Sequence, residues 1–147
     1  MIHDSTISCL RTFGYESTAT LLEYFRDWWN IISVKTPRKG VMQRNDFCNP
    51  IVSDDDWKLE HLLEFVDWMK LWRTQVKQKE RKGLSQPTFD AIIQTTEGIV
   101  LLSKHLLRKP DWKYVLTGAF VSDPLEKRYV YMKLTLNDHT LFGRLNE

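Results

Sequence analysis

The sequence predicts a mainly α-helical protein with three or four helices and one short extended segment. In three long stretches the apolar residues recur every three or four positions, the period of a helix with one buried face. Capping residues, glycine or proline stand near the ends of these stretches, and no internal repeat or low-complexity tract is present. The 147 residues are 42% hydrophobic and 12% aromatic, which is enough to bury a core as one domain or two small ones.

The first predicted helix covers residues 16–32. Its N-cap is Ser17 or Thr20, and Glu23 stands three residues after Thr20, which is the spacing of a capping box. Its apolar face consists of Leu21, Leu22, Phe25, Trp28, Trp29 and Ile32. In residues 34–53, Pro37 and Gly40 are among several turn-forming residues that break any regular period, so this stretch is predicted to be a loop or linker.

The second predicted helix covers residues 53–79 and begins at Ser53. A hydroxyl cap followed by Asp54, Asp55 and Asp56 suits a helix start, because these groups satisfy free amides and favour the positive end of the dipole. Together with His61 the triplet could be imagined as a metal site. However, adjacent carboxylates point in different directions around a helix start, so we prefer the capping interpretation.

The third predicted helix covers residues 87–107, where Ser85 and Pro87 open it and Pro110 follows its end. Residues 112–120 are apolar and aromatic, but Gly118 weakens a strand prediction, so they are expected to be extended or irregular.

Asp123 and Glu126, in the order Asp-Pro-Leu-Glu, have the spacing of a further helix start. Beyond residue 133 the pattern fades, and the end is predicted to be disordered or a weak strand.

The formal net charge of +2 is too small to indicate a polyanion partner by itself, so any nucleic-acid surface must be local. Three basic clusters are candidates for DNA phosphate contacts, although such charge runs are more often solvated faces and helix ends. They are Arg73, Lys77, Lys79, Arg81 and Lys82; Lys35, Arg38, Lys39 and Arg44; and Lys104, Arg108, Lys109 and Lys113. The helical spacing of Trp28, Trp29, Trp68 and Trp72 favours core or interface positions over base stacking.

Cys9 and Cys48 lie far apart with no zinc-site spacing, which favours a reduced intracellular compartment while leaving a single disulfide open. No signal peptide and no run of apolar residues long enough to span a membrane is apparent, so we expect a soluble protein with no membrane partner. The four histidines fall at no recognised ligand or triad spacing.

Residues 114–126, YVLTGAFVSDPLE, resemble the last catalytic segment of P-element-type and THAP-domain DNA transposases. The upstream stretch GLSQPTFDAIIQTTEGIVLLSKHLL resembles the helical run that leads into that segment, and residues 28–72 are more weakly similar to the end of the family's guanine-nucleotide-binding insertion. The resemblance implies two parts. Residues 1–82 would be the end of the helical, GTP-binding insertion domain, and residues 83–147 the C-terminal segment of the RNase H-like core.

This resemblance implies a cut-and-paste transposase that uses two metal ions, Mg²⁺ by preference, held by three acidic residues. Glu126 matches the third acidic ligand, and Asp123, one turn earlier, would be its companion; together they are the catalytic candidates. The first two acids have no counterpart in this chain, so catalysis by the chain alone is not expected. The resemblance also implies a nuclear protein that binds transposon-end DNA, with GTP bound through the insertion in the intact enzyme.

Two features leave alternatives open. Asp at the cap with Glu at the third position is also an ordinary capping box. After Glu126 the match decays, because Val130 stands where the family usually has glycine. The main alternative is a non-enzymatic, transposon-derived helical module that binds a partner protein or associates with itself. There is no Gly-rich phosphate loop, and guanine-nucleotide binding by this chain alone is not expected.

Overall fold

The computed structural model describes residues 2–78 and 83–120. In this part the chain forms five α-helices and two 3-10 turns: α1 (Asp4–Thr12), α2 (Glu16–Ile32), α3 (Lys39–Gln43), η1 (Asp46–Cys48), α4 (Trp57–Gln78), α5 (Gln86–Leu107) and η2 (Thr117–Ala119). The described residues contain no strand, and their only β-type pairing is an isolated antiparallel bridge between Ile51 and Val115. The prediction of a mainly α-helical fold is confirmed.

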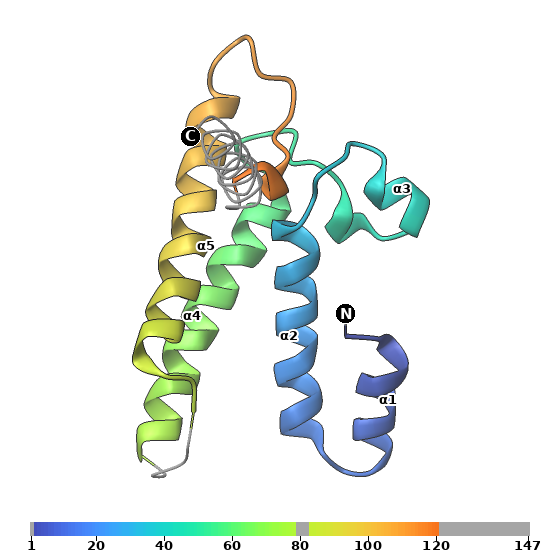
Figure 1. Ribbon diagram of the computed structural model, residues 1–147, viewed down its shortest axis with the longest axis vertical. Coiled ribbons are helices and arrows are strands. Elements are labelled where there is room, and N and C mark those ends of the chain that lie inside the picture. The colour runs from blue at the N-terminus through green and yellow to red at the C-terminus, as the bar shows by residue number, and fades with distance from the viewer. Residues whose placement is uncertain (1, 79–82, 121–147) are drawn as a thin grey trace, which may run out of the picture.

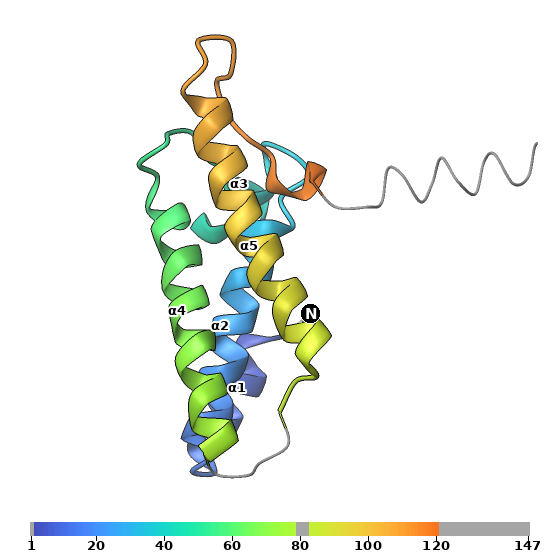
Figure 2. The same ribbon diagram turned by 90° about the vertical axis from the view of Figure 1, so that its left-hand side faces the viewer.

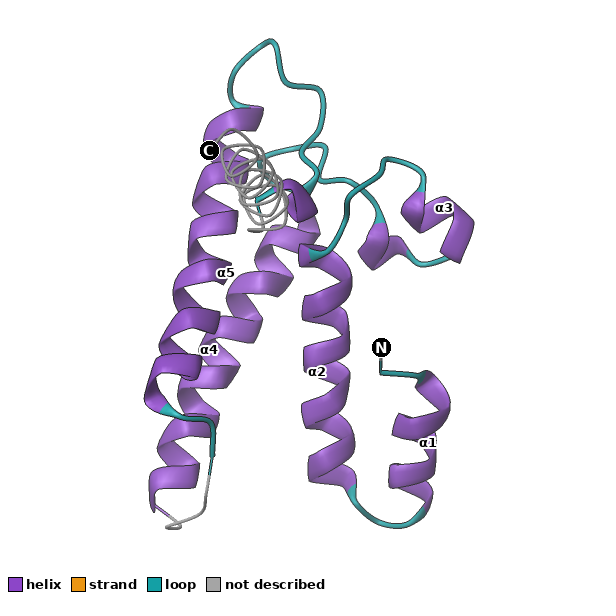
Figure 3. Cartoon of the chain, viewed as in Figure 1, coloured by secondary structure: helices purple, strands orange, loops and turns teal. Residues whose placement is uncertain are grey.

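The long helices stand side by side in an antiparallel arrangement (Figure 1). α4 and α5 form a hairpin, α2 packs against α4, and α1 folds back along α2. The second view shows the three long helices running along the same axis, with α3 and most of the loops gathered near one end (Figure 2). Helices therefore dominate the described chain, and the α1–α2 connection lies at the opposite end from α3 (Figure 3).

α2 has the predicted bounds, but its predicted cap is wrong. The N-cap is Tyr15, whose carbonyl oxygen accepts a hydrogen bond from the Ala19 amide at 3.0 Å. Ser17 and Thr20 therefore lie inside the helix. The sequence pattern also missed α1, because α1 has nine residues and buries only Ile7, so it carries no apolar stripe.

α4 begins at Trp57, later than the predicted start at Ser53. The Ser53 hydroxyl accepts from the Asp55 amide at 3.4 Å within a turn, so it cannot cap the helix. Asp56 takes that role: its carboxylate accepts from the Lys58 amide at 3.1 Å and the Val52 amide at 3.2 Å. Lys58 Nζ donates to the same carboxylate, and both side chains are almost fully buried. One acid of the triplet thus caps the helix. The predicted end at residue 79 lies outside the described residues.

α5 agrees with the prediction, including its cap. Ser85 is the N-cap, and its hydroxyl accepts from the Thr88 amide at 3.3 Å. The following residues, 112–120, are irregular apart from η2, as expected.

The predicted loop at residues 34–53 is not without structure, because it contains α3 and η1. Gly40 permits this fold: an added Cβ there would lie 2.8 Å from the Asn49 backbone nitrogen.

Two clusters of buried side chains form the core. One contains Ile31, Ile32, Ile51, Leu59, Leu62, Ile99, Val100 and Val115, and the other contains Phe65, Val66, Met69, Phe89 and Ile93. Trp28 packs against both, and Trp68 and Trp72 pack against the second, which confirms their predicted core positions. Trp29 is 52% exposed, so it is not a core residue, and an interface position for it stays a prediction.

Both clusters draw residues from before and after the predicted domain boundary between residues 82 and 83. Phe65 and Met69 of α4, for example, share a cluster with Phe89 and Ile93 of α5. The division into an insertion part and a nuclease part remains a prediction about family origin, and no gap in packing marks it within the described residues.

Candidate functional site

The predicted catalytic residues Asp123 and Glu126 lie in residues 121–147, outside the described part of the chain. The described part of the same segment, residues 114–120, has a defined path that leads toward them. It follows α5 and crosses to the end of α2.

Three buried residues fix this path. Val115 exchanges two backbone hydrogen bonds with Ile51, at 2.8 and 3.1 Å. The Thr117 hydroxyl donates to the carbonyl oxygen of Ile31 at the end of α2, and Thr117 is only 1% exposed. The Gly118 amide donates to the carbonyl oxygen of Val34 at 2.9 Å. The segment is therefore tied to the residues at the C-terminal end of α2 and to the loop before α4.

Gly118 is required by space. An added Cβ at this position would lie 2.9 Å from the Val34 carbonyl oxygen and 3.0 Å from the Ser33 carbonyl carbon, both of which are backbone atoms. Val115, Thr117 and Gly118, which contribute to the family resemblance, thus have structural roles in this chain. Their arrangement accounts for part of the motif without any reference to catalysis.

Several of the basic residues proposed for DNA contact have partners within the chain. Arg73 donates to the Leu84 carbonyl oxygen and to Gln86 Oε1, and its guanidinium lies 5.0 Å from the centre of the Phe89 ring. Lys39 Nζ donates to the Ser33 carbonyl oxygen at 3.2 Å. Arg108 pairs with Asp54 at 3.0 Å. These contacts give the three side chains partners within the chain, and DNA contact by the basic clusters stays a prediction.

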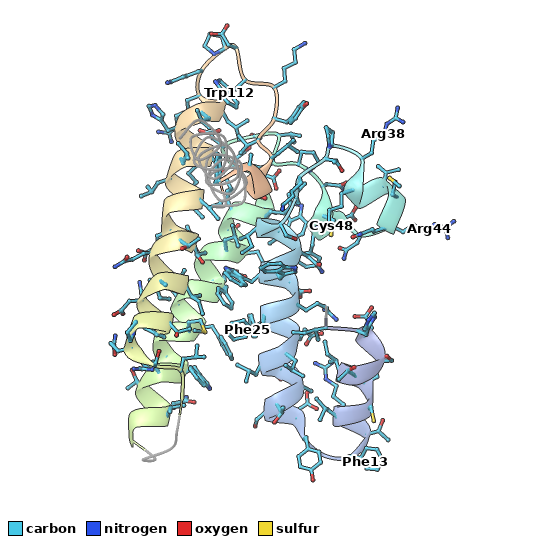
Figure 4. The ribbon with its side chains drawn as sticks, viewed as in Figure 1. Phe13, Phe25, Arg38, Arg44, Cys48 and Trp112 are labelled. Carbon is cyan, nitrogen blue, oxygen red and sulfur yellow. The ribbon has the colours of Figure 1, made fainter. Side chains whose placement is uncertain are left out.

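Arg38 and Arg44 are different, because they point outward from the α3 region (Figure 4). Both are exposed, and Arg44 has a positive φ of 50° as the C-cap of α3. Lys109 and Lys113 are also exposed. Side chains of residues 77–82, which include the other members of the first cluster, lie outside the described set.

The sequence pattern did not anticipate a polar cavity of about 680 Å³ between the start of α1, the second half of α2 and the α3–η1 region. Ile2, His3, Asp4, Arg26, Asp27, Asn30, Gln43, Arg44, Asn45, Asp46 and Phe47 line it. One signal was available in the sequence: Asp27 and Asn30 interrupt the apolar end of α2, and both are buried, with 8% of each residue exposed.

Arg26 organises the charges of this cavity. Its Nε donates to Asp27 Oδ1 at 2.8 Å, and its other nitrogens contact Asp4 and, at 3.7 Å, Glu23. Burial by itself lowers the pKa of Arg26. The hydrogen bond and charge of Asp27, with the charges of Asp4 and Glu23, outweigh that effect and raise the pKa above its ordinary value. Arg26 is thus a structural cation whose charge is paired with the carboxylates of these acidic residues.

A second, more apolar cavity of about 530 Å³ shares Ile2, Arg26 and Asn30 with the first and adds Phe25, Trp28 and Trp29. Together the two cavities form a polar hollow with an aromatic extension along α2. This arrangement has the size of a small-molecule site, but its acidic lining gives no cradle for an anion.

The described residues do not fit a metal centre. In residues 2–78 and 83–120 no group of three or more His, Cys, Asp or Glu side chains could hold a metal ion. The implied Mg²⁺ therefore has no ligand set in this part of the chain.

Two further predictions concern the cysteines and the presence of a membrane-spanning helix. Cys9 is exposed and Cys48 is buried, and both are free thiols, so the single disulfide left open by the sequence is not formed. No helix among the described residues is long and apolar enough to cross a membrane.

Comparison with known proteins assigns the chain to no family. No protein-family model matches the chain, and no significant match to a curated protein or a solved structure was found.

Proposed function

We propose that this chain is the C-terminal part of a P-element-type DNA transposase, a protein that cuts and joins DNA when its catalytic core is intact. The observation that carries the proposal is the motif at residues 114–126, in sequence with the helical run of α5 before it. Buried Thr117 and Gly118 support it, because they anchor the chain six and five residues before Asp123 on the C-terminal end of α2 and the residues that follow it.

In this proposal the described helices act as a scaffold, and Glu126 contributes one carboxylate to a three-acid site. The other two acids and the nuclease sheet must come from sequence that this chain does not contain. The chain alone is therefore expected to be inactive, and its DNA partner and nuclear location belong to the same proposal.

The test restores the missing upstream sequence and measures cleavage and strand transfer on transposon-end DNA in the presence of Mg²⁺. We expect Glu126→Gln to abolish activity, because the change removes a carboxylate of the site. Glu64→Gln is the matched control, since the Glu64 side chain is 66% exposed on α4. Equal activity in the two variants would reject the role assigned to Glu126.

We also propose that this chain alone does not retain guanine-nucleotide binding. Its large polar cavity is lined by three carboxylates, Asp4, Asp27 and Asp46, and one of its two arginines, Arg26, is already paired. A triphosphate would meet unfavourable charge there. Titration with GTP, monitored by thermal unfolding, should leave the midpoint unchanged; a saturable rise would contradict this.

A second candidate is a non-enzymatic helical interaction module. Val41 and Met42 favour it, because they are 76% and 80% exposed on α3, side by side with the exposed Arg38 and Arg44. In this case the isolated chain should be a cooperatively folded oligomer, or bind a protein without metal or DNA. Circular dichroism melting and sedimentation distinguish the cases, and a monomer that melts without cooperativity counts against the module.

A further inference from the structure

Asn30 of α2 carries a buried amide that has no partner in the described part of the chain. Only 8% of the residue is exposed, and none of the hydrogen bonds between described residues uses its side-chain amide. Asn30 lines both cavities beside α2, the polar one and the more apolar one. A buried amide normally has a hydrogen-bond partner, because an unsatisfied one costs free energy. Asn30 therefore offers an unused donor and an unused acceptor where the two cavities meet.

The charges beside the polar cavity are negative in sum. Two arginines share four carboxylates in one network of salt bridges. They are Arg11 and Arg26, with Asp4, Glu16, Glu23 and Asp27. Four negative and two positive charges leave an excess of two negative charges in this network. Such an excess attracts a cation and repels an anion.

Asp46 adds a further carboxylate to the lining of the polar cavity. Its Oδ1 accepts from Asn49 Nδ2 at 3.2 Å, and it has no cationic partner among the described residues. Arg44 and His3 also line the cavity, but both are exposed, and Arg44 points outward from the α3 region (Figure 4). The Asp46 carboxylate is therefore available to a cation that enters the cavity.

Aromatic rings form a wall of the apolar cavity. Phe25, Trp28 and Trp29 line it, and their ring centres are 6.1 Å apart for the first pair and 6.2 Å apart for the second. Trp29 is half exposed, so part of its ring is open to a ligand. Aromatic faces attract cations and also pack against apolar groups. The wall thus favours the same charge of ligand as the carboxylates do.

We propose that the joined cavities bind a small organic cation, a primary ammonium group attached to an apolar or aromatic body. The ammonium group donates to the Asn30 side-chain carbonyl oxygen and to the Asp46 carboxylate, and the body lies against the aromatic wall. A primary ammonium is favoured over a quaternary one, because both side chains offer oxygen acceptors for N–H donors. The volumes of about 680 and 530 Å³ suit a small molecule. This site is independent of the transposase assignment.

NMR titration of the full chain tests the site. The probe is phenethylammonium, and the matched anion is hydrocinnamate, which has the same phenyl ring and the same two-carbon linker. We expect saturable shifts of the backbone amides of residues 25–30 and 44–47 with the cation, and none with the anion. No saturable shift of these amides with the cation, or an equal effect of the two probes, would overturn the proposal.

The role of Asp46 is tested by removing its charge. Asp46→Asn should weaken the binding of phenethylammonium by on the order of tenfold, because one of the negative charges that attract the ligand is lost. Asp67→Asn is the matched control, since Asp67 is exposed on α4 and lines neither cavity. It should bind the probe as the wild type does. An unchanged affinity in Asp46→Asn would overturn the proposal.

The role of Asn30 is tested with a side chain of similar shape that has no amide. Asn30→Leu should weaken the binding of phenethylammonium several-fold and leave the thermal midpoint unchanged or raised, because the lost amide has no partner that stabilises the fold. An unchanged affinity would overturn the proposal. A lowered midpoint would show that the amide has a structural partner and would overturn its assignment to the ligand.

Discussion

Replacing Thr96 by valine should destabilise the protein through a single lost polar contact. Thr96 is fully buried in α5, and its hydroxyl accepts from Trp28 Nε1 at 2.9 Å while donating to the Ile92 carbonyl oxygen at 2.7 Å. Valine keeps the shape of the side chain and removes the acceptor. The indole N–H of Trp28, which is partly buried between the two core clusters, then has no partner among the described residues.

The magnitude follows from the cost of the lost hydrogen bond and from two effects that reduce this cost. A hydrogen bond contributes about 0.5–1.5 kcal/mol net, and an unsatisfied buried donor costs about 1–3 kcal/mol. Because Trp28 is only partly buried, water can solvate some of the freed N–H, and the added methyl group of valine recovers apolar contact. We therefore expect the free energy of unfolding to fall by about 1–2 kcal/mol.

Urea unfolding measures this difference as a shift of the midpoint at constant slope. Thr95→Val is the control, because Thr95 is exposed on the same helix and its change should stay within about 0.5 kcal/mol. In a Trp28→Phe background the donor is already absent, so Thr96→Val should cost much less there. A Thr96→Val protein as stable as the wild type, or an equal loss in both backgrounds, would refute the reasoning.

Three further predictions concern stability and thiol chemistry. Gly118→Ala should lower the free energy of unfolding by about 1–3 kcal/mol, because the added Cβ meets the backbone of Val34 and Ser33. Ala119→Gly at the exposed neighbour is the control and should change stability in urea far less. Comparable losses in the two variants would contradict a close contact at Gly118. Ser103→Ala should raise the thermal midpoint, because the buried Ser103 hydroxyl has no hydrogen-bond partner, and a lower midpoint would mean that a partner exists. Burial raises the pKa of the Cys48 thiol, an effect that the Lys39 charge only partly offsets. The neutral Cys48 thiol therefore makes its full contribution to stability below about pH 8.5, and this contribution is lost as the pH rises through the raised pKa of the folded protein. Alkylation followed by mass spectrometry should modify exposed Cys9 first and Cys48 only after unfolding; equal rates in the native protein would contradict the burial of Cys48.

Sequence periodicity located the long helices because each buries one face. α2 and α5 have the bounds that apolar spacing and the Ser85 cap predict, within one residue. Periodicity could not place the start of α4, since Ser53 and Asp56 are both acceptable caps in the sequence. The local hydrogen bonds of the buried Asp56 carboxylate with Lys58 and with the Val52 amide decide between them.

The polar cavity could not be predicted for a related reason. Asp27 and Asn30 are neighbours on α2, but the other walls come from residues 2–4 and 43–47, which approach only through tertiary packing. The catalytic assignment to Asp123 and Glu126 rests on motif resemblance, and these residues lie outside the described chain. Packing alone can account for two residues of this motif, because Thr117 and Gly118 make buried contacts with the end of α2 and the residues after it.

The contacts that close the fold also suggest an order of assembly. The α1–α2 and α4–α5 hairpins join neighbours in the chain, whereas Thr117 meets Ile31 across a separation of 86 residues and Trp28 meets Thr96 across 68. Distant contacts lose more chain entropy before they form, so they are expected to arise after the local hairpins. The crossing of residues 115–118 over the end of α2 would then be a late event in folding, and substitutions there should mainly speed unfolding.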